Sequence, residues 1–248
     1  SIYGGSGADS IQGDAQIRLI DSVRGGNDAI FGGADNDQIF GDAWLFDSSR
    51  GGNDRMYGGD DDDAIYGDDF IGTDEARGGN DQLDGGTGND FLEGDGVELS
   101  GNFRCGNDTL FGGHGDDYLD GDGVDVSGSV RSGNDTLVGG AGNDVLTGDV
   151  DPTISTDLTF VVRGADRFVF AAGSGQDIIL DFNNGKDRIV LTGFTGIDNF
   201  AEVRAKSSQD GSDVVVDLGA AAGHAAGDDV LTLANFRLWQ LDAGDFVF

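Results

Sequence analysis

The apolar residues in the first 150 positions occur in short runs, not in long amphipathic stretches. The runs follow one pattern, Gly-Gly-x-x-x-Asp-x-apolar-x. Copies begin at Gly4, Gly32, Gly58, Gly85, Gly112 and Gly139, at spacings of 28, 26, 27, 27 and 27 residues. A constant period of a few tens of residues is typical of solenoids and other repeat architectures, so the pattern predicts stacked coils.

A second pattern lies between successive copies of the first. It opens with Gly-Asp, continues through a variable loop and closes with Gly-Gly-Asn-Asp-x-apolar-x or a close variant of it. One coil of about 27 residues therefore contains a six-residue turn, a three-residue strand, an enlarged turn of about fifteen residues and a second three-residue strand. This alternation predicts a solenoid with two faces.

Each predicted strand offers one apolar side chain to the interior of the coil. Strands stacked at ~4.8 Å form two parallel sheets, so the inward side chains form two columns. One column contains Ile11, Ile39, Ile65, Leu92, Leu119 and Leu146; the other contains Ile30, Met56, Leu83, Leu110, Leu137 and Phe168. The expected fold class is all-β, a parallel β-roll (β-solenoid) with enlarged turns on one side and a β-rich C-terminal cap.

The composition of the chain indicates that the fold binds a cation. The chain has 47 acidic and 14 basic residues, a net charge of −33, and only four of the acidic residues are glutamates. Solubility alone would not favour aspartate over glutamate, whereas short carboxylates on glycine-rich turns suit hard cations. The charge disfavours nucleic acid and anionic lipid as partners, and no apolar stretch is long enough for a membrane span.

The sixth position of the short turn is an aspartate in every coil. Stacking places neighbouring carboxylates roughly 5 Å apart, where they repel one another, so the column requires a cation. Glycines at the first two positions allow a sharp turn that aims backbone carbonyls inward. The six aspartates are Asp9, Asp37, Asp63, Asp90, Asp117 and Asp144.

The nonapeptides Gly112-Gly-His-Gly-Asp-Asp-Tyr-Leu-Asp and Gly139-Gly-Ala-Gly-Asn-Asp-Val-Leu-Thr resemble the calcium-binding repeats of the RTX (repeats-in-toxin) family. This resemblance implies several Ca²⁺ ions between neighbouring turns of a β-roll. It also implies that the sixth-position aspartates and backbone carbonyls are the ligands. The short-turn column is therefore the first candidate metal site.

Two departures from the family pattern affect these sites. One turn carries an insertion of about nine residues relative to the usual RTX coil, and the fourth repeat position is Asp35 and Asp61 in two coils instead of glycine. We expect altered geometry or extra charge at those two coils. Further candidate ligands at the enlarged turn come from the Gly-Asp and Asn-Asp pairs: Asp14, Asp42, Asp68, Asp95, Asp122, Asp149, Asp28, Asp54, Asp81, Asp108 and Asp135.

An arginine immediately precedes each closing segment. The six are Arg24, Arg50, Arg77, Arg104, Arg131 and Arg163. The main interpretation is an ion-pair ladder that neutralises loop carboxylates and orders the enlarged turn. The alternatives are a ladder that binds an anionic polymer and a column of solvated side chains.

The repeat ends at Asp149, and residues 164–248 form the predicted cap, with residues 1–163 as the roll. Apolar runs near residues 178–182, 188–191, 214–218, 230–233 and 246–248 predict antiparallel strands that close the roll. Residues 164–170, 176–182 and 186–191 resemble the C-terminal region of serralysin-type proteases. The terminal Asp245-Phe-Val-Phe resembles a type I secretion signal.

No catalytic motif accompanies these features. The two histidines, His114 and His224, lie in separate glycine-rich segments, and neither a His-Glu-x-x-His helix nor a Gly-x-Ser-x-Gly elbow is present. We therefore expect no enzyme activity from the chain. Since Ser1-Ile2-Tyr3 resembles the middle of a coil, we expect a longer parent with any activity upstream.

The predicted function is calcium-triggered folding of a secreted, extracellular and monomeric module, with the type I secretion apparatus as partner. The alternative is an RTX adhesin-like module that binds a surface polysaccharide or receptor. Its enlarged turns would then form an apolar ridge of Trp44, Phe46, Phe70, Phe103 and Val130.

Overall fold

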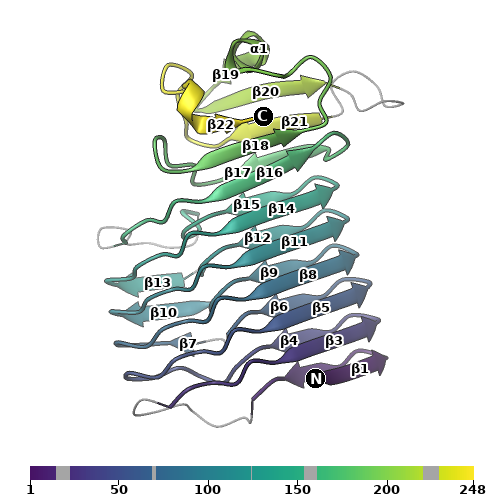
Figure 1. Cartoon of the computed structure of the whole chain (residues 1–248), viewed down its shortest axis with the longest axis vertical. Helices are drawn as coiled ribbons and strands as arrows, with labels where there is room; N and C mark the ends of the chain where they lie inside the picture. Colours follow the sequence, from purple (N-terminus) through teal and green to yellow (C-terminus); the bar gives the residue numbers. More distant parts are fainter. Residues whose placement is uncertain (15–22, 69–70, 124, 154–160, 220–228) are drawn as a thin grey trace.

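The computed structural model describes residues 1–14, 23–68, 71–123, 125–153, 161–219 and 229–248. Coils are stacked along one long axis, with the N-terminus at one end and the C-terminal segment at the other (Figure 1). Two long sheets form the walls of the stack, which confirms the all-β parallel β-roll.

The first wall is a nine-stranded sheet in which every pairing is parallel. Its strands, in spatial order, are β1 (Ile2–Ser6), β3 (Ala29–Ala34), β5 (Arg55–Asp60), β8 (Gln82–Thr87), β11 (Thr109–His114), β14 (Thr136–Ala141), β16 (Arg167–Ala171), β18 (Arg188–Thr192) and β22 (Phe246–Val247). The register places equivalent repeat positions opposite one another, as in Leu110 opposite Leu83 and Leu137.

The second wall is a ten-stranded sheet that is parallel except at its C-terminal end. Its strands are β2 (Ser10–Gln12), β4 (Gln38–Phe40), β6 (Ala64–Tyr66), β9 (Phe91–Glu93), β12 (Tyr118–Asp120), β15 (Val145–Thr147), β17 (Gln176–Ile179), β21 (Asp229–Leu233), β20 (Asp213–Gly219) and β19 (Ser207–Asp210). Strands of three residues suffice in the repeats because each strand presents a single side chain to the interior.

The core between the walls consists of the two apolar columns that the sequence predicts. Ile39, Ile65, Leu92, Leu119 and Leu146 are fully buried. The same holds for the opposite column of Ile30, Met56, Leu83, Leu110, Leu137 and Phe168. Burial of one side chain per strand leaves a narrow core, so the turns have to contribute to stability.

The enlarged turns add a feature that the short-period pattern does not reveal. They form a third, three-stranded parallel sheet of β7 (Ile71–Gly72), β10 (Glu98–Gly101) and β13 (Asp125–Gly128), which lies beside the main roll (Figure 1). A second apolar cluster lies within these turns: Leu45, Ala76, Leu99, Phe103, Val126, Val130 and Val150. The inserted residues therefore form a second lobe with its own core.

The C-terminal region continues the roll further than expected. The prediction of antiparallel strands is wrong for β17, β18 and β22, which pair only in parallel with neighbouring strands of the walls, and it holds for one side of β21, which is parallel to β17 and antiparallel to β20. Antiparallel pairing occurs at β19, β20 and β21. The parallel register persists because Asp166, Asp177 and Asp187 repeat the Asp-x-apolar segment of the coils.

Aromatic side chains fill the end of the stack. Phe168, Phe170, Phe182, Phe194, Phe236 and Phe246 are buried in the main core cluster. The helix α1 (Phe200–Lys206) and the short 3₁₀ helix η1 (Ala243–Asp245) lie at this end. Within the described residues, no helix combines the length and the apolar character needed to cross a membrane.

Candidate calcium sites

The short turns place the predicted aspartates in one continuous ladder. The backbone N–H of Asp90 donates to Oδ1 of Asp117 at 2.8 Å, and the N–H of Asp117 donates to Oδ1 of Asp144 at 3.0 Å. The same bond joins Asp9 to Asp37, Asp37 to Asp63 and Asp63 to Asp90. Each carboxylate therefore uses one oxygen to hold the preceding coil.

The second carboxylate oxygen in this ladder has no donor. Within the described residues, the Oδ2 atoms of all six short-turn aspartates are buried and lack a hydrogen-bond partner. A Cβ atom added to Gly4 would lie 2.7 Å from Oδ2 of Asp9 and 2.6 Å from the carbonyl oxygen of Gly32 in the next coil. Two acceptor oxygens thus converge on one point that only a residue without a side chain leaves open.

Burial and the proximity of neighbouring carboxylates also change the pKa values of these aspartates. Burial, reinforced by neighbouring aspartates, raises the pKa of Asp63 and of Asp117 to about 7. It raises the pKa of Asp90 and of Asp144 to about 6. Without a counter-charge, the ionised ladder is therefore unfavourable near neutral pH.

The enlarged-turn edge carries the same ladder in spite of its insertion. The N–H of Asp81 donates to Oδ1 of Asp108 at 2.7 Å, and that of Asp108 to Oδ1 of Asp135 at 2.7 Å. Equivalent bonds link Asp28 to Asp54 and Asp54 to Asp81. A Cβ atom on Gly94 would lie 2.6 Å from Oδ2 of Asp108 and closer still to the carbonyl oxygen of Gly121. Both edges therefore offer the same kind of oxygen cradle.

Desolvation is stronger on the enlarged-turn edge. Burial raises the pKa of Asp54 to about 7 and that of Asp108 to about 8. Burial and repulsion from neighbouring aspartates raise the pKa of Asp81 and of Asp135 well above the usual value. The second lobe covers this edge, which explains why its carboxylates are the harder ones to ionise.

The Gly-Asp carboxylates form a second row beside this ladder. They bind the backbone of the closing segment in their own coil: Asp14 accepts from Gly26 N–H at 2.8 Å, and Asp122 accepts from Gly133 N–H at 2.8 Å. The remaining pairs join Asp42 to Gly52, Asp68 to Gly79, Asp95 to Gly106 and Asp149 to Gly164. These aspartates close the enlarged turn, and they bring additional carboxylate oxygens to the same edge.

Four further aspartates extend the ladders beyond the sequence prediction. Asp144 N–H donates to Asp177, Asp135 N–H to Asp166, and Asp166 N–H to Asp187. Asp181 accepts from the N–H groups of Gly148 and Asp149. The signal that could have found three of them is an aspartate two positions before an inward apolar residue, as in Asp177 before Ile179.

The two aspartates that replace glycine keep a positive φ but have a smaller value of it. Asp35 and Asp61 both have φ of 75°, whereas Gly88 and Gly115 at the same position have φ of 137° and 127°. Aspartate tolerates the left-handed region better than most residues. Oδ2 of Asp35 accepts a hydrogen bond from Gly7 N–H at 2.9 Å, so this substitution adds a link between coils.

The single cysteine lies within the carboxylate row. The Sγ atom of Cys105 and carboxylate oxygens of Asp95 and Asp122 lie within 4.8 Å of one another. Burial, followed by the charge of Asp122, raises the pKa of the thiol well above its usual value. Cys105 therefore packs as a neutral thiol where the earlier coils have glycine.

The expected ion-pair ladder of arginines is wrong for most of its members. Within the described residues, ion pairs form only at Arg163, whose Nη1 lies 3.2 Å from Asp149 Oδ2 and 3.3 Å from Asp181 Oδ2. The Gly-Asp carboxylates of the other coils face the backbone of the closing segments, which leaves the other arginines without an acidic partner in the described chain.

The expected apolar ridge on the enlarged turns is also wrong. Phe103 and Val130 are buried in the second core, whereas Trp44 is 45% exposed. Phe46 is partly buried and packs edge-to-face against Trp44 at 6.4 Å. Phe70 lies outside the described residues, as does His224, while His114 is exposed at the end of β11.

Comparison with known proteins assigns the repeats. The RTX calcium-binding nonapeptide repeat (HemolysinCabind) matches residues 1–17, 23–43, 49–73, 75–96, 106–125 and 131–151, which is just over half of the chain. No curated protein matches the sequence significantly.

Two solved structures are similar in part. One is the extracellular lipase LipA from Serratia marcescens, with a TM-score of 0.39 and 20% identity, over 89% of this chain and 40% of the lipase. The other is the AlgE6R3 subunit of the Azotobacter vinelandii mannuronan C5-epimerase, with a TM-score of 0.31 and 28% identity, over 58% of this chain and 78% of that chain. The chain thus spans less than half of the lipase's length.

Proposed function

Because the chain belongs to the RTX calcium-binding nonapeptide repeat family, whose members are typically secreted, we propose that it is a module that calcium folds outside the cell. In this proposal the chain leaves the producing cell unfolded through a type I apparatus, as part of a longer polypeptide. Calcium in the external medium then orders the stack of coils.

One observation carries the proposal: the buried Oδ2 atoms in both ladders have no donor among the described residues, and they face a glycine carbonyl oxygen of the next coil. An all-oxygen set of carboxylate and carbonyl ligands is what Ca²⁺ prefers. A buried polar atom without a partner is costly, and a row of them is costlier. A cation between neighbouring coils would remove this cost and would join the coils together.

The ligands in the proposal follow the two ladders. On the short-turn edge they are Asp9, Asp37, Asp63, Asp90, Asp117 and Asp144, with Asp177 as a further member. On the other edge they are Asp28, Asp54, Asp81, Asp108 and Asp135, supplemented by Asp166 and the Gly-Asp row. The bound ion would supply positive charge and coordination; the backbone supplies the stacking.

Circular dichroism during a calcium titration tests the proposal. In excess chelator we expect the β signal to be largely lost, and calcium should restore it cooperatively with a Hill coefficient above one, since each ion stabilises two adjoining coils. Magnesium is the matched control, because its preference for small octahedral sites should make it a poor substitute. A complete β signal in chelator that calcium does not change would refute the proposal.

The export part of the proposal needs a variant that leaves the fold intact. Asp245 is buried in a capping box with Asp242, and Phe246 pairs with β18, so deletion of residues 245–248 would also disturb the sheet. Val247 and Phe248 are 39% and 47% exposed. We expect Val247→Ser with Phe248→Ser to reduce type I export while calcium-induced folding is unchanged. If the variant and the parent are exported equally, the side chains of Val247 and Phe248 are not part of a secretion signal, and the export part of the proposal is wrong.

A further inference from the structure

Five arginines form a regular row along the enlarged turns. Parallel bridges connect Arg24 to Arg50, Arg50 to Arg77, Arg77 to Arg104, and Arg104 to Arg131. The N–H groups of Arg77 and Arg104 each donate to a carbonyl of the preceding coil at 3.1 Å. The backbone therefore places one arginine per coil in register, at the ~4.8 Å spacing of paired strands.

This row forms no ion pair with the described part of the chain. Arg24, Arg50, Arg104 and Arg131 are exposed and Arg77 is partly buried, and none of them makes an ion pair or side-chain hydrogen bond with another described residue. Arg163 differs, since it binds Asp149 and Asp181. A protein with a net charge of −33 thus holds like positive charges side by side on one narrow line.

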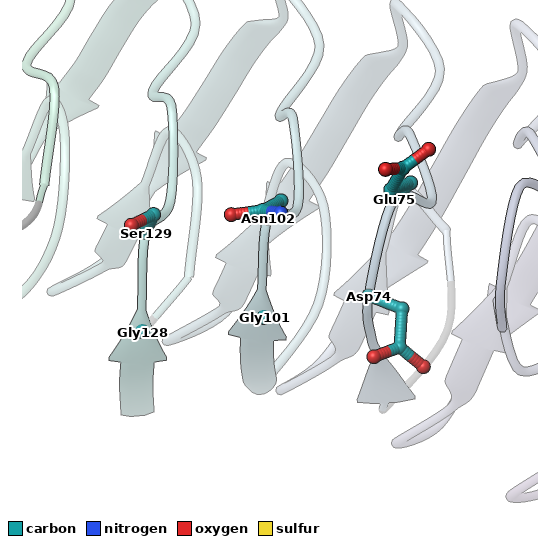
Figure 2. Close-up of a pocket in the computed structure, with 6 residues that line it drawn as sticks. All are labelled: Asp74, Glu75, Gly101, Asn102, Gly128 and Ser129. Atoms are coloured by element: carbon teal, nitrogen blue, oxygen red, sulfur yellow. The ribbon is translucent and has the colours of Figure 1, made fainter.

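A groove follows the same line. Arg50, Arg77, Arg104 and Arg131 line a hollow of about 360 Å³ together with Ser48, Glu75, Asn102 and Ser129, which precede them by two positions. Residues two apart on extended backbone project to the same side, so the two rows run in parallel. Figure 2 shows Glu75, Asn102 and Ser129 at equivalent places on three successive coils.

The floor of the groove is apolar and buried, and the groove is longer than one coil. Phe103 and Val130, which lie between the two rows in sequence, are buried in the second core and form part of the lining. A neighbouring hollow of about 500 Å³ shares Glu75, Asn102 and Ser129 and is otherwise lined by Asp74, Gly101 and Gly128, so the arginines mark one side of this surface only. The groove therefore crosses several coils and suits an extended ligand.

We propose that this arginine groove binds a linear acidic polysaccharide with one carboxylate on each sugar. A guanidinium group binds a carboxylate through two parallel hydrogen bonds, and the row offers one such group per coil, so a polymer with carboxylates along its whole length can engage several arginines at once. The Ser48, Asn102 and Ser129 side chains offer hydrogen bonds to sugar hydroxyl groups. This binding role goes beyond calcium-dependent folding.

The narrowness of the row selects a thin polymer. The positive line is one residue wide on an acidic molecule, so a duplex nucleic acid or an anionic bilayer would place most of its charges against acidic surface. A single polysaccharide chain can lie along the row and avoid that surface. A single-stranded nucleic acid is the competing ligand that the experiment has to separate.

Calorimetry with a short oligogalacturonate tests the proposal on calcium-folded protein, with calcium in excess over the oligomer and folding checked by circular dichroism. The variant R77Q/R104Q/R131Q should bind roughly tenfold more weakly or worse, and with a smaller dependence on salt. The control R55Q/R167Q/R204Q removes the same charge from exposed positions outside the groove and should bind like the parent. Equal losses in the two triple variants would overturn the proposal.

A variant that removes a negative charge from the groove provides a second test, because it should strengthen binding. Glu75 is the acidic residue in the second row, so Glu75→Gln should tighten binding, roughly two- to fivefold for one exposed charge. The R77K/R104K/R131K variant keeps the charge but loses the paired hydrogen bonds, and its affinity should lie between those of the parent and the glutamine variant. Equal affinity for a neutral dextran oligomer or for an oligothymidylate would show that the groove does not select a carboxylated sugar.

Discussion

The two edges of the roll carry the same aspartate ladder in very different surroundings. On the short-turn edge, a six-residue turn presents one ladder carboxylate per coil. On the other edge, a turn of about fifteen residues adds a second carboxylate row, a third sheet and a separate apolar core. Even so, the donor, the acceptor and the glycine cradle correspond atom for atom.

This difference shows which residues define the site. The ladder depends on the Asp-x-apolar segment that enters each strand and on the glycine that faces the next coil; the length of the intervening turn does not alter them. Asn-to-backbone bonds accompany both ladders, as in Asn107 N–H to Asn80 and Asp116 N–H to Asn89, each at 2.8 Å. The insertion is therefore accommodated outside the site.

The largest expected effect comes from pH, because it acts on both edges together. The folded-state pKa values of the ladder aspartates are raised above the unfolded value of 3.8, to about 6 to 8 for Asp90, Asp117 and Asp108. The calcium-free fold then holds more protons than the unfolded chain, so its stability is full below pH ~4 and falls as pH rises through these pKa values.

In excess chelator, the β signal should therefore increase on acidification from about pH 8 to about pH 5. Circular dichroism at a series of pH values measures this effect. A chelated chain whose β signal instead grows with rising pH would contradict the assignment of buried, proton-holding ladders.

Removal of one ladder carboxylate should have the next largest effect, and the size of this effect should differ between the two edges. Asp117→Ala leaves its short-turn site without a carboxylate of its own, whereas Asp108→Ala leaves Asp95 and Asp122 at the enlarged-turn edge. We expect Asp117→Ala to raise the calcium midpoint of folding more, with a loss of roughly 3 kcal/mol or more.

The matched controls are Asp9→Ala, at the end of the same ladder, and Asp108→Ala combined with Asp122→Ala. Asp9→Ala should shift the calcium midpoint less than Asp117→Ala does. The double variant should shift it by nearly as much as Asp117→Ala. If Asp108→Ala alone has the greater effect, the second carboxylate row contributes nothing to the site.

A cavity in the second core should destabilise the second lobe but leave the aspartate ladders intact. Phe103 is 1% exposed, and Phe103→Ala should destabilise the lobe by about 3 kcal/mol. Hydrogen exchange should show faster exchange at β10 and β13, while the short-turn edge remains protected. Uniform loss of protection over the whole chain would mean that the lobe and the roll unfold as one unit.

Substitution of an arginine should have the smallest effect on stability, and this effect should differ between Arg163 and the other arginines. Arg163→Gln breaks contacts to Asp149 and Asp181, so it should cost ~1 kcal/mol. Arg104→Gln should be nearly neutral for stability, since its side chain is exposed without an ionic partner in the described chain. Chemical denaturation in calcium compares the two, and equal losses would indicate that Arg104 also forms a stabilising pair.

The repeated part of this structure could be predicted from the sequence because its signal is periodic. The inward columns, the two edges and the aspartate ladders follow from residues that return at equivalent positions, such as Leu83, Leu110 and Leu137. Asp166, Asp177 and Asp187 were missed because the glycines before them change, although the Asp-x-apolar segment remains. The third sheet could not be predicted, since β7, β10 and β13 differ in sequence and pair only once the coils are stacked.

The narrow core has a mechanical consequence. Within residues 1–149 the coils contribute similar contacts and contain about 27 residues each, so a force applied along this part of the stack should detach one coil at a time. Each detached coil would release ~90 Å of extended chain, since a residue spans at most about 3.3–3.6 Å. Single-molecule extension would then proceed in steps of nearly equal length, and the force at each step would report how firmly one coil is bound to the next.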